Sequence, residues 1–171
     1  MKKYITGGIR LNLFLFLIVA ALTYIAIQKP GINKQVTYNK ISQLNEEQIQ
    51  HIEIISADNK KIRFIKKNHQ WMFKTDNNET TIDPDKIGYL FKLLNADSLE
   101  NFSASQEHLN QYHLSEPRIT VKFDNFTIAF GDSEPLKRRR YILINKQVHL
   151  INDMYYHFLL QPANTYLSTT R

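Results

Sequence analysis

The longest run of cationic side chains in the sequence lies near its C-terminal third. It consists of Lys137, Arg138, Arg139 and Arg140. Side chains of this type pair with carboxylates and phosphates, so the run could bind an anionic lipid headgroup, an anionic glycan or an acidic partner. The alternative is a solvated strand edge, where charges block edge-to-edge pairing and the nearby Asp132 and Glu134 neutralise the run.

The residue types that would support metal binding or catalysis do not occur at useful spacings. There are six histidines and no cysteine. His108 and His113 are five residues apart, which does not place them on one helix face. Neither a zinc-binding pair nor a nucleophile elbow is present. The sequence therefore predicts no catalytic, metal or cofactor site, and a protein that is not an enzyme.

An aromatic segment, Met154–Leu160, is the second candidate for binding. It is apolar on nearly all sides and far too short to span a membrane. It could be a buried cap on a sheet. Alternatively, Tyr155, Tyr156 and Phe158 could form a surface on which a protein partner docks, because exposed aromatic patches usually mark contacts.

The net charge of +6 argues against nucleic-acid binding once its distribution is considered. Five of the six charges belong to the first 34 residues, which leaves +1 for the remainder. These five are Lys2, Lys3, Arg10, Lys29 and Lys34. A nucleic-acid-binding domain needs a basic face of its own, which this balance does not favour.

The N-terminal apolar run predicts a membrane anchor. Residues 11–27 would form a helix about 25 Å long, slightly less than a hydrocarbon core of about 30 Å. Cations concentrate before the run, which predicts a cytoplasmic N-terminus over 1–10, a transmembrane helix over 11–28 and the rest of the chain outside. The predicted location is the inner (cytoplasmic) membrane of a bacterium, with a periplasmic main domain. The rival interpretation is a cleaved signal peptide with Val19 and Ala21 at the cleavage site.

Beyond a linker over 29–37, residues 38–162 are expected to form an exocytoplasmic α+β domain, followed by a C-terminal tail over 163–171. Two stretches alternate apolar and polar residues around turn-forming clusters, which is typical of antiparallel hairpins and meanders. These stretches are 49–74 and 119–151, with 131–135 expected as a loop. The two similar halves suggest either two sheet-plus-helix lobes or one sheet with helices on a single face.

A few short helices complete the expected fold. Asp83 is a suitable N-cap before Pro84, and the apolar stripe that follows has helical spacing. Its residues are Ile87, Leu90, Phe91 and Leu94. A second helix is expected over 105–112, capped by Ser105, and a third over 154–160, capped by Asn152 and Asp153.

The order of these elements resembles the bacterial domain-of-unknown-function family 4340. The matching segments are IQHIEII, IRFIKKNHQWMF, IDPDKIGYLFKLL, YHLSEPRITVKF, TIAFGDSEPLKRRRYILI and VHLIND. The residues that carry the resemblance are Trp71, Leu114, Pro117, Phe130, Gly131, Arg140 and Tyr141. His113 stands where that family commonly has glycine. The resemblance covers about two thirds of the chain. It implies an envelope-facing domain behind one anchor, associated with transport systems, and no catalytic residues.

The function predicted from all of this is a non-enzymatic accessory or interaction subunit of an envelope assembly or transport system. Its expected partners are the membrane and an envelope protein, without nucleic acid, metal or cofactor. The alternative is a binding module for an anionic lipid or glycan that uses residues 137–140.

Overall fold

A computed structural model describes residues 5–28, 38–75, 78–134 and 136–167. The chain divides into two compact units, residues 1–37 and residues 38–171. The predicted linker over 29–37 lies outside the described residues, as do residues 1–4 and 168–171.

The first unit contains one helix, α1 (Ile5–Gln28). The side chains of residues 11–25 are exposed, and Thr23 Oγ1 donates a hydrogen bond to the Val19 carbonyl oxygen at 2.8 Å. Across the described residues, no helix combines the length and the apolar character that crossing a membrane requires. The transmembrane anchor expected over 11–28 therefore stays a prediction.

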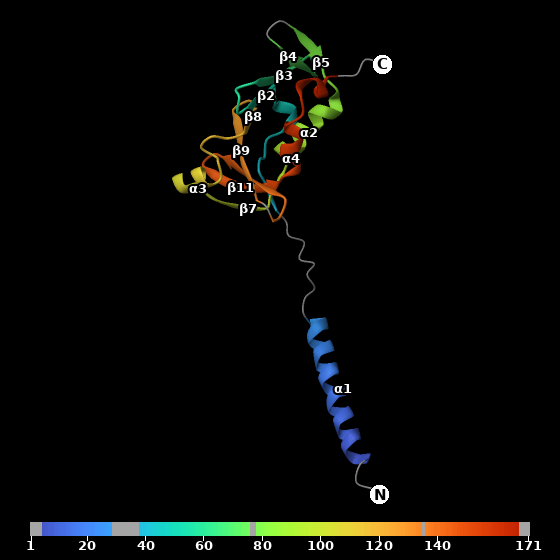
Figure 1. Cartoon of the computed structure of the whole chain (residues 1–171). Helices are drawn as coiled ribbons and strands as arrows, with labels where there is room; N and C mark the ends of the chain where they lie inside the picture. The colour runs from blue at the N-terminus through green and yellow to red at the C-terminus, as the bar shows by residue number, and fades with distance from the viewer. Residues whose placement is uncertain (1–4, 29–37, 76–77, 135, 168–171) are drawn as a thin grey trace. The chain divides into compact units, whose positions relative to one another are not determined.

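The second unit is built on one antiparallel sheet of nine strands (Figure 1). Their order across the sheet is β5-β4-β3-β2-β8-β9-β10-β11-β7. The strands are β2 (His51–Ser56), β3 (Lys61–Lys67), β4 (Gln70–Lys74), β5 (Glu79–Thr81), β7 (Glu100–Ser103), β8 (Ile119–Phe123), β9 (Phe126–Glu134), β10 (Arg139–Ile144) and β11 (Gln147–Asn152). Two short strands, β1 (Asn39–Lys40) and β6 (Asp97–Ser98), pair separately. The α+β class and the antiparallel meanders predicted from the sequence are confirmed.

The two meanders form one sheet, so the two-lobe arrangement, one of the two that the sequence left open, is wrong. Strand β2 pairs with β3 on one side and with β8 on the other, so that Ile54 lies opposite both Ile62 and Val121. Apolar and polar residues alternate along each strand in the same way whether the two meanders form one sheet or two. Only the pairing of β2 with β8, which are far apart in the sequence, decides the arrangement.

Residues with a left-handed backbone close the hairpins. Asn68 and His69 join β3 to β4, and Asn145 and Lys146 join β10 to β11, all with φ between 46° and 67°. Two-residue hairpin turns require this conformation, and asparagine adopts it at low cost. The loop expected over 131–135 is wrong, because β9 continues to Glu134 and pairs there with Arg139.

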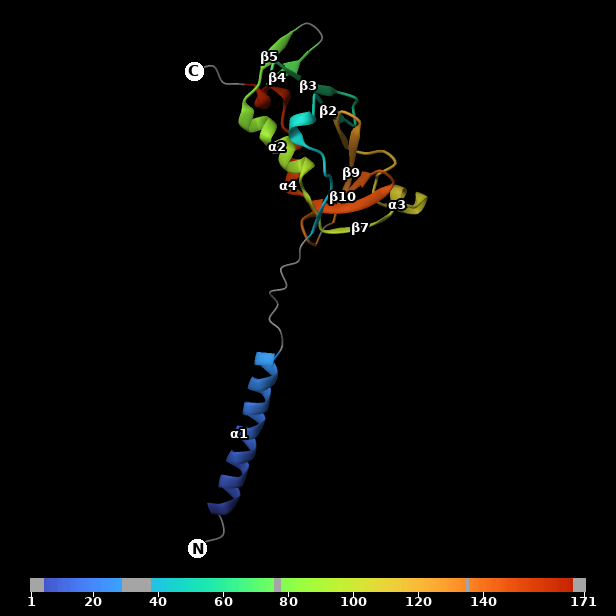
Figure 2. The same ribbon diagram turned by 180° about the vertical axis from the view of Figure 1, so that it is seen from behind.

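Two helices cover one face of the sheet and enclose the main core. Helix α2 (Pro84–Leu94) begins as predicted, with the Asp83 carboxylate accepting from the Asp85 backbone N–H at 2.9 Å. Its apolar stripe packs with Phe64, Phe123 and Phe130 of the sheet. Helix α4 (Met154–Leu159) lies beside α2 on the same face (Figure 2). The 3-10 helix η1 (Glu46–Gln48) precedes β2.

A third helix, α3 (Gln106–Gln111), lies on the side of the sheet away from α2 and α4 (Figure 1). Ser105 caps it as predicted, accepting from the His108 N–H at 3.1 Å. The Tyr112 ring that follows α3 stacks on Tyr141 of β10 at 3.9 Å between centroids. Both faces of the sheet are therefore covered at this end, rather than a single face.

The domain continues past residue 162. The prediction of a tail over 163–171 is therefore wrong for residues 163–167, which the structure describes. The 3-10 helix η2 (Ala163–Tyr166) places Tyr166 in the core with no exposed surface. Its ring packs against Phe64 at 5.1 Å and Phe158 at 5.5 Å. Leu167 then pairs with Ile82. Residues 163–167 thus belong to the folded domain.

Candidate functional site

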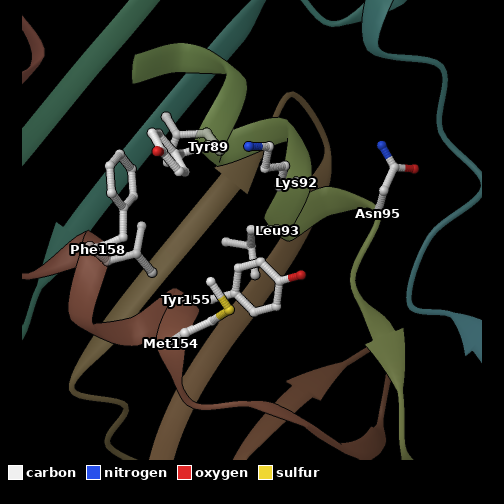
Figure 3. A pocket seen from close by; sticks show the side chains of 9 residues that line it. Tyr89, Lys92, Leu93, Asn95, Met154, Tyr155 and Phe158 are labelled. Atoms are coloured by element: carbon white, nitrogen blue, oxygen red, sulfur yellow. The ribbon is translucent and has the colours of Figure 1, made fainter. Parts of the chain in front are cut away.

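Helix α4 separates two hollows on the surface of the domain. The first, which we call the α2–α4 groove, has a volume of about 350 Å³ and lies between the two helices (Figure 3). It is lined by Tyr89, Leu90, Lys92, Leu93, Asn95, Met154, Tyr155, Phe158 and Leu159. Two of the three docking residues predicted from the sequence, Tyr155 and Phe158, belong to it.

The α2–α4 groove is apolar and open to solvent. Met154 is 61% exposed and Tyr89 is 44% exposed, although both are large hydrophobic residues. The Tyr89 ring contacts Phe158 at 4.8 Å, and Lys92 Nζ lies 4.5 Å above the Tyr89 ring, which places one cation at the rim. Burial raises the pKa of the Tyr155 hydroxyl. The groove therefore offers mainly apolar contact area, with one cation at its rim.

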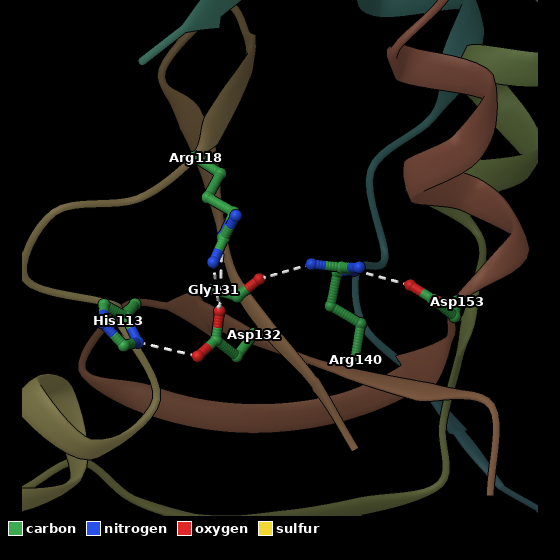
Figure 4. Close-up of polar contacts among 6 residues, drawn as sticks. All are labelled: His113, Arg118, Gly131, Asp132, Arg140 and Asp153. Atoms are coloured by element: carbon green, nitrogen blue, oxygen red, sulfur yellow. Dashed lines mark hydrogen bonds and ion pairs between the residues drawn. The ribbon is translucent and has the colours of Figure 1, made fainter. Parts of the chain in front are cut away.

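The other side of α4 is fixed by a buried arginine. Arg140 is 6% exposed; its Nε donates to Asp153 Oδ1 at 2.5 Å and its Nη1 donates to the Gly131 carbonyl oxygen at 2.6 Å (Figure 4). The guanidinium carbon also lies 3.5 Å from the centre of the Tyr156 ring. Asn152 and Asp153 were both expected to cap α4. Asn152 Oδ1 accepts from the Met154 N–H at 2.9 Å, whereas Asp153 occupies the N-cap position without a capping hydrogen bond from its side chain. Asp153 instead holds Arg140.

The predicted basic run is divided between interior and surface. Arg139 pairs with Glu134 and with Glu100, whose carboxylate lies 2.7 Å from Nη1. These hydrogen bonds raise the pKa of Arg139 and lower that of Glu134. Only Lys137 and Arg138 remain exposed. The four cations therefore cannot bind one anion together, as the sequence suggested. Strand β10 begins within the run, at Arg139, and it turns the last two side chains towards partners of their own.

A second hollow, which we call the cationic cleft, lies on the Tyr156 side of α4 and has a volume of about 850 Å³. It is lined by Ser56, Ala57, Asp58, Lys60, Lys61, Ile62, Arg118, Ile119, Tyr156, Leu159, Leu160, Gln161, Pro162 and Ala163. Sequence reasoning missed it, because its three cations come from the β2–β3 turn, from the first residue of β3 and from the residue before β8. The pairing of β2 with β8 alone brings these segments together.

Asp132 connects two further side chains beside the cationic cleft. Its carboxylate lies 2.7 Å from His113 Nδ1 and accepts from Arg118 Nε at 3.2 Å (Figure 4). His113 has a φ of 52°, so the position where the resembled family has glycine is in the left-handed region here. Its contact with Asp132 offsets part of the cost of this conformation.

One serine–histidine contact was also missed by the sequence reasoning. Ser98 Oγ lies 2.9 Å from His149 Nδ1, and burial lowers the pKa of the His149 imidazole. Ser98 is buried and its hydroxyl also donates to the Glu100 carbonyl oxygen at 3.3 Å. Within the described residues no carboxylate contacts His149, and no group of three or more metal-ligating side chains is present. This contact therefore ties β6 to β11.

The chain matches no protein-family model, and no match was found among curated proteins or among solved structures. The resemblance to family 4340 stays a prediction.

Proposed function

We propose that this chain is a non-enzymatic interaction subunit that binds a protein partner through the α2–α4 groove. The observation that carries this proposal is the exposure of large apolar side chains, Met154 and Tyr89, around a hollow lined mainly by apolar residues. Contiguous exposed apolar surface of this kind usually marks an interaction site.

The groove suits an aromatic or long aliphatic side chain of a partner. A volume of about 350 Å³ accommodates such a group, and burying it would contribute about 2 kcal/mol. Aromatic anchors in preformed pockets often dominate binding energy at interfaces. The fixed position of α4, held by Arg140 and Asp153, supports a groove that exists before the partner arrives.

The same proposal places the chain in a membrane. The described side chains of α1 are mostly apolar and all exposed, with Phe16 at 70%, and a lipid environment would cover them. In this proposal α1 tethers the domain at the bacterial cytoplasmic membrane, with the domain outside the cytoplasm. The partner is then an envelope protein of an assembly or transport system.

Site-specific cross-linking in cells tests this function. A photoreactive amino acid replaces Met154 at the mouth of the groove, and a matched control carries it at Lys74, an exposed position on β4. We expect one dominant adduct with a single membrane protein from position 154, identified by mass spectrometry, and none from position 74. Equal or diffuse adducts from both positions would overturn the proposal.

A chain starting at Lys34 behind a cleavable export signal separates the roles of the two units. If α1 tethers the domain, this shorter chain leaves the membrane fraction and its adduct from position 154 decreases. Retention of the shorter chain in the membrane fraction, without any partner adduct, would contradict the anchoring role of α1.

A second candidate function, binding to an anionic lipid or glycan, rests on the tip of the β9–β10 connection. Leu136 is 92% exposed and precedes the two exposed cations, Lys137 and Arg138. An exposed leucine beside cations suits a membrane surface, where each cation contributes about 1 kcal/mol. This function predicts salt-sensitive sedimentation with vesicles containing phosphatidylglycerol. Binding that survives Lys137→Gln with Arg138→Gln would eliminate it.

A further inference from the structure

We infer that the cationic cleft binds a single-chain anionic amphiphile, a molecule with a carboxylate or phosphate head on an apolar chain. The cleft, at about 850 Å³, is within the range of small-molecule sites. Of its lining residues only Leu159 also lines the α2–α4 groove. The two sites can therefore be tested separately.

The apolar part of the ligand is specified by the floor of the cleft. Ile62 and Ile119 come from the sheet, and Tyr156 and Leu159 come from α4. Leu160 adds a side chain that is 55% exposed. Ile119 and Leu159 are buried, so an acyl chain would mainly cover the exposed side chain of Leu160 and the half-buried side chains of Ile62 and Tyr156.

The anionic head is specified by the charges at the rim. The lining contains the three cations Lys60, Lys61 and Arg118, against one carboxylate, Asp58. Asp58 is already paired with Lys60 at 2.7 Å, and this contact lowers the pKa of Asp58 and raises that of Lys60. Lys61 is exposed and supplies the principal charge for the head.

Arg118 is positioned to be the second contact for the head. Its Nε and Nη2 engage Asp132 Oδ1, at 3.2 Å and 3.1 Å. A guanidinium presents five donors, so this contact leaves donors on Nη1 for a carboxylate or phosphate oxygen. The head would lie between Lys61 and Arg118, with the chain directed along the floor.

Backbone hydrogen bonding favours an amphiphile over an acidic peptide. The Ser56 N–H donates to the Lys60 carbonyl oxygen at 3.0 Å, and the Ala57 N–H donates to the Arg118 carbonyl oxygen at 2.9 Å. These amides of the wall are therefore already satisfied. A peptide would bring its own backbone N–H and C=O groups into the cleft. Some of them would have no hydrogen-bond partner there, which costs binding free energy. An acyl chain brings no such groups.

Photolabelling of the full chain with a diazirine-bearing fatty acid tests the inference. Peptide mapping should place the label on residues 156–163 and around Ile62. Dodecanoate and dodecyl phosphate compete separately, so that the more effective competitor identifies the head as carboxylate or phosphate. Neutral dodecyl maltoside should compete at least about tenfold more weakly, because it lacks the charge that pairs with Lys61.

Charge reversal provides the second arm of the test. Lys61→Glu should reduce labelling of the cleft about tenfold, because it replaces one attraction with a repulsion. Lys74→Glu, an exposed change on β4, should leave labelling unchanged. Arg118→Gln should also reduce labelling, and its unfolding curve shows whether loss of the Asp132 contact disturbs the fold.

Several outcomes would overturn the inference. Labelling that is equal in wild type and Lys61→Glu would show that the rim charge plays no part. Competition by an acidic peptide but not by dodecanoate would assign the cleft to a protein partner. Label confined to α1 or to the α2–α4 groove would show adsorption to apolar surface elsewhere. None of these results depends on the cross-linking from position 154, so the cleft can be tested even if no partner is found at the α2–α4 groove.

Discussion

The two sides of α4 use aromatic residues in opposite ways. On one side the Tyr156 ring lies against Arg140, which is buried and paired with Asp153. On the other side Tyr155 and Phe158 line an open groove. Three aromatic residues within one short segment therefore divide between fixing the helix and offering contact area.

This difference shows how a helix of six residues can present a stable surface. So short a helix has little stability of its own, so tertiary contacts must hold it. Arg140 provides these contacts from β10, through Asp153 before the helix and Tyr156 within it. With α4 held by these contacts, Tyr155 and Phe158 pack against the core and still leave part of their surface open at the groove.

The largest expected effect comes from removing the contact that holds α4. Arg140→Ala leaves the Asp153 carboxylate and the Gly131 carbonyl oxygen without their partner, so we expect the free energy of unfolding to fall by about 3 kcal/mol. Arg138→Ala changes an exposed cation of the same run and should have almost no effect. Urea denaturation of both variants measures the difference; equal stabilities would show that α4 is held by other contacts.

A pair of glycine substitutions compares the packing around β9 with that around α2. A Cβ on Gly131 would clash with the Tyr112 carbonyl oxygen, so Gly131→Ala should destabilise the domain by about 2 kcal/mol. A Cβ on Gly88, within α2, meets nothing within 4 Å. Gly88→Ala should therefore stabilise by about 0.5 kcal/mol. In thermal unfolding, the midpoint temperature should fall for Gly131→Ala and rise for Gly88→Ala, relative to wild type. If both midpoints fall or both rise, the packing described is contradicted.

Tyr166, which is buried in the core beside Phe158, gives a pH-dependent prediction. Burial raises the pKa of its hydroxyl to about 12, above the ordinary value of 10. The unfolded chain therefore loses this proton first, and stability should fall as the pH rises from 10 towards 12, by about 2 kcal/mol. Tyr166→Phe should show a shallower decrease. An identical pH dependence in both proteins would show that Tyr166 ionises normally.

The same substitution has a smaller effect at neutral pH. Among the described residues the Tyr166 hydroxyl has no hydrogen-bond partner although it is buried. Removing an unsatisfied polar group should stabilise the domain by about 1 kcal/mol. Chemical denaturation of Tyr166→Phe at pH 7 measures this gain, and a loss of stability would indicate that the hydroxyl is solvated or bonded after all.

The smallest effect on stability is expected on the open side of α4. Met154 is mostly exposed, so Met154→Gln should change the free energy of unfolding by less than about 0.5 kcal/mol. The same variant should weaken capture of the partner, because it places a polar group at the mouth of the α2–α4 groove. If Met154→Gln unfolds easily, or if it still captures the partner normally, the two sides of α4 do not differ in the way proposed.

Local sequence determined the elements of the domain. Alternating apolar residues defined β2, β3 and β8 to β11, and Asp83 with Pro84 marked the start of α2, because these signals depend only on near neighbours in the chain. The apolar run over 11–27 indicated a helix in the same way, and α1 spans Ile5–Gln28.

Tertiary structure decided what local signals could not express. The run Lys137 to Arg140 looks uniform in the sequence, yet β10 begins within it and buries Arg140 against Asp153, 13 residues away. The cationic cleft depends on β2 pairing with β8, and the α2–α4 groove depends on how α2 and α4 lie on the sheet. Contacts between distant segments form only when the whole core closes, so the residue types predicted the helices and strands and the tertiary structure determined which side chains meet.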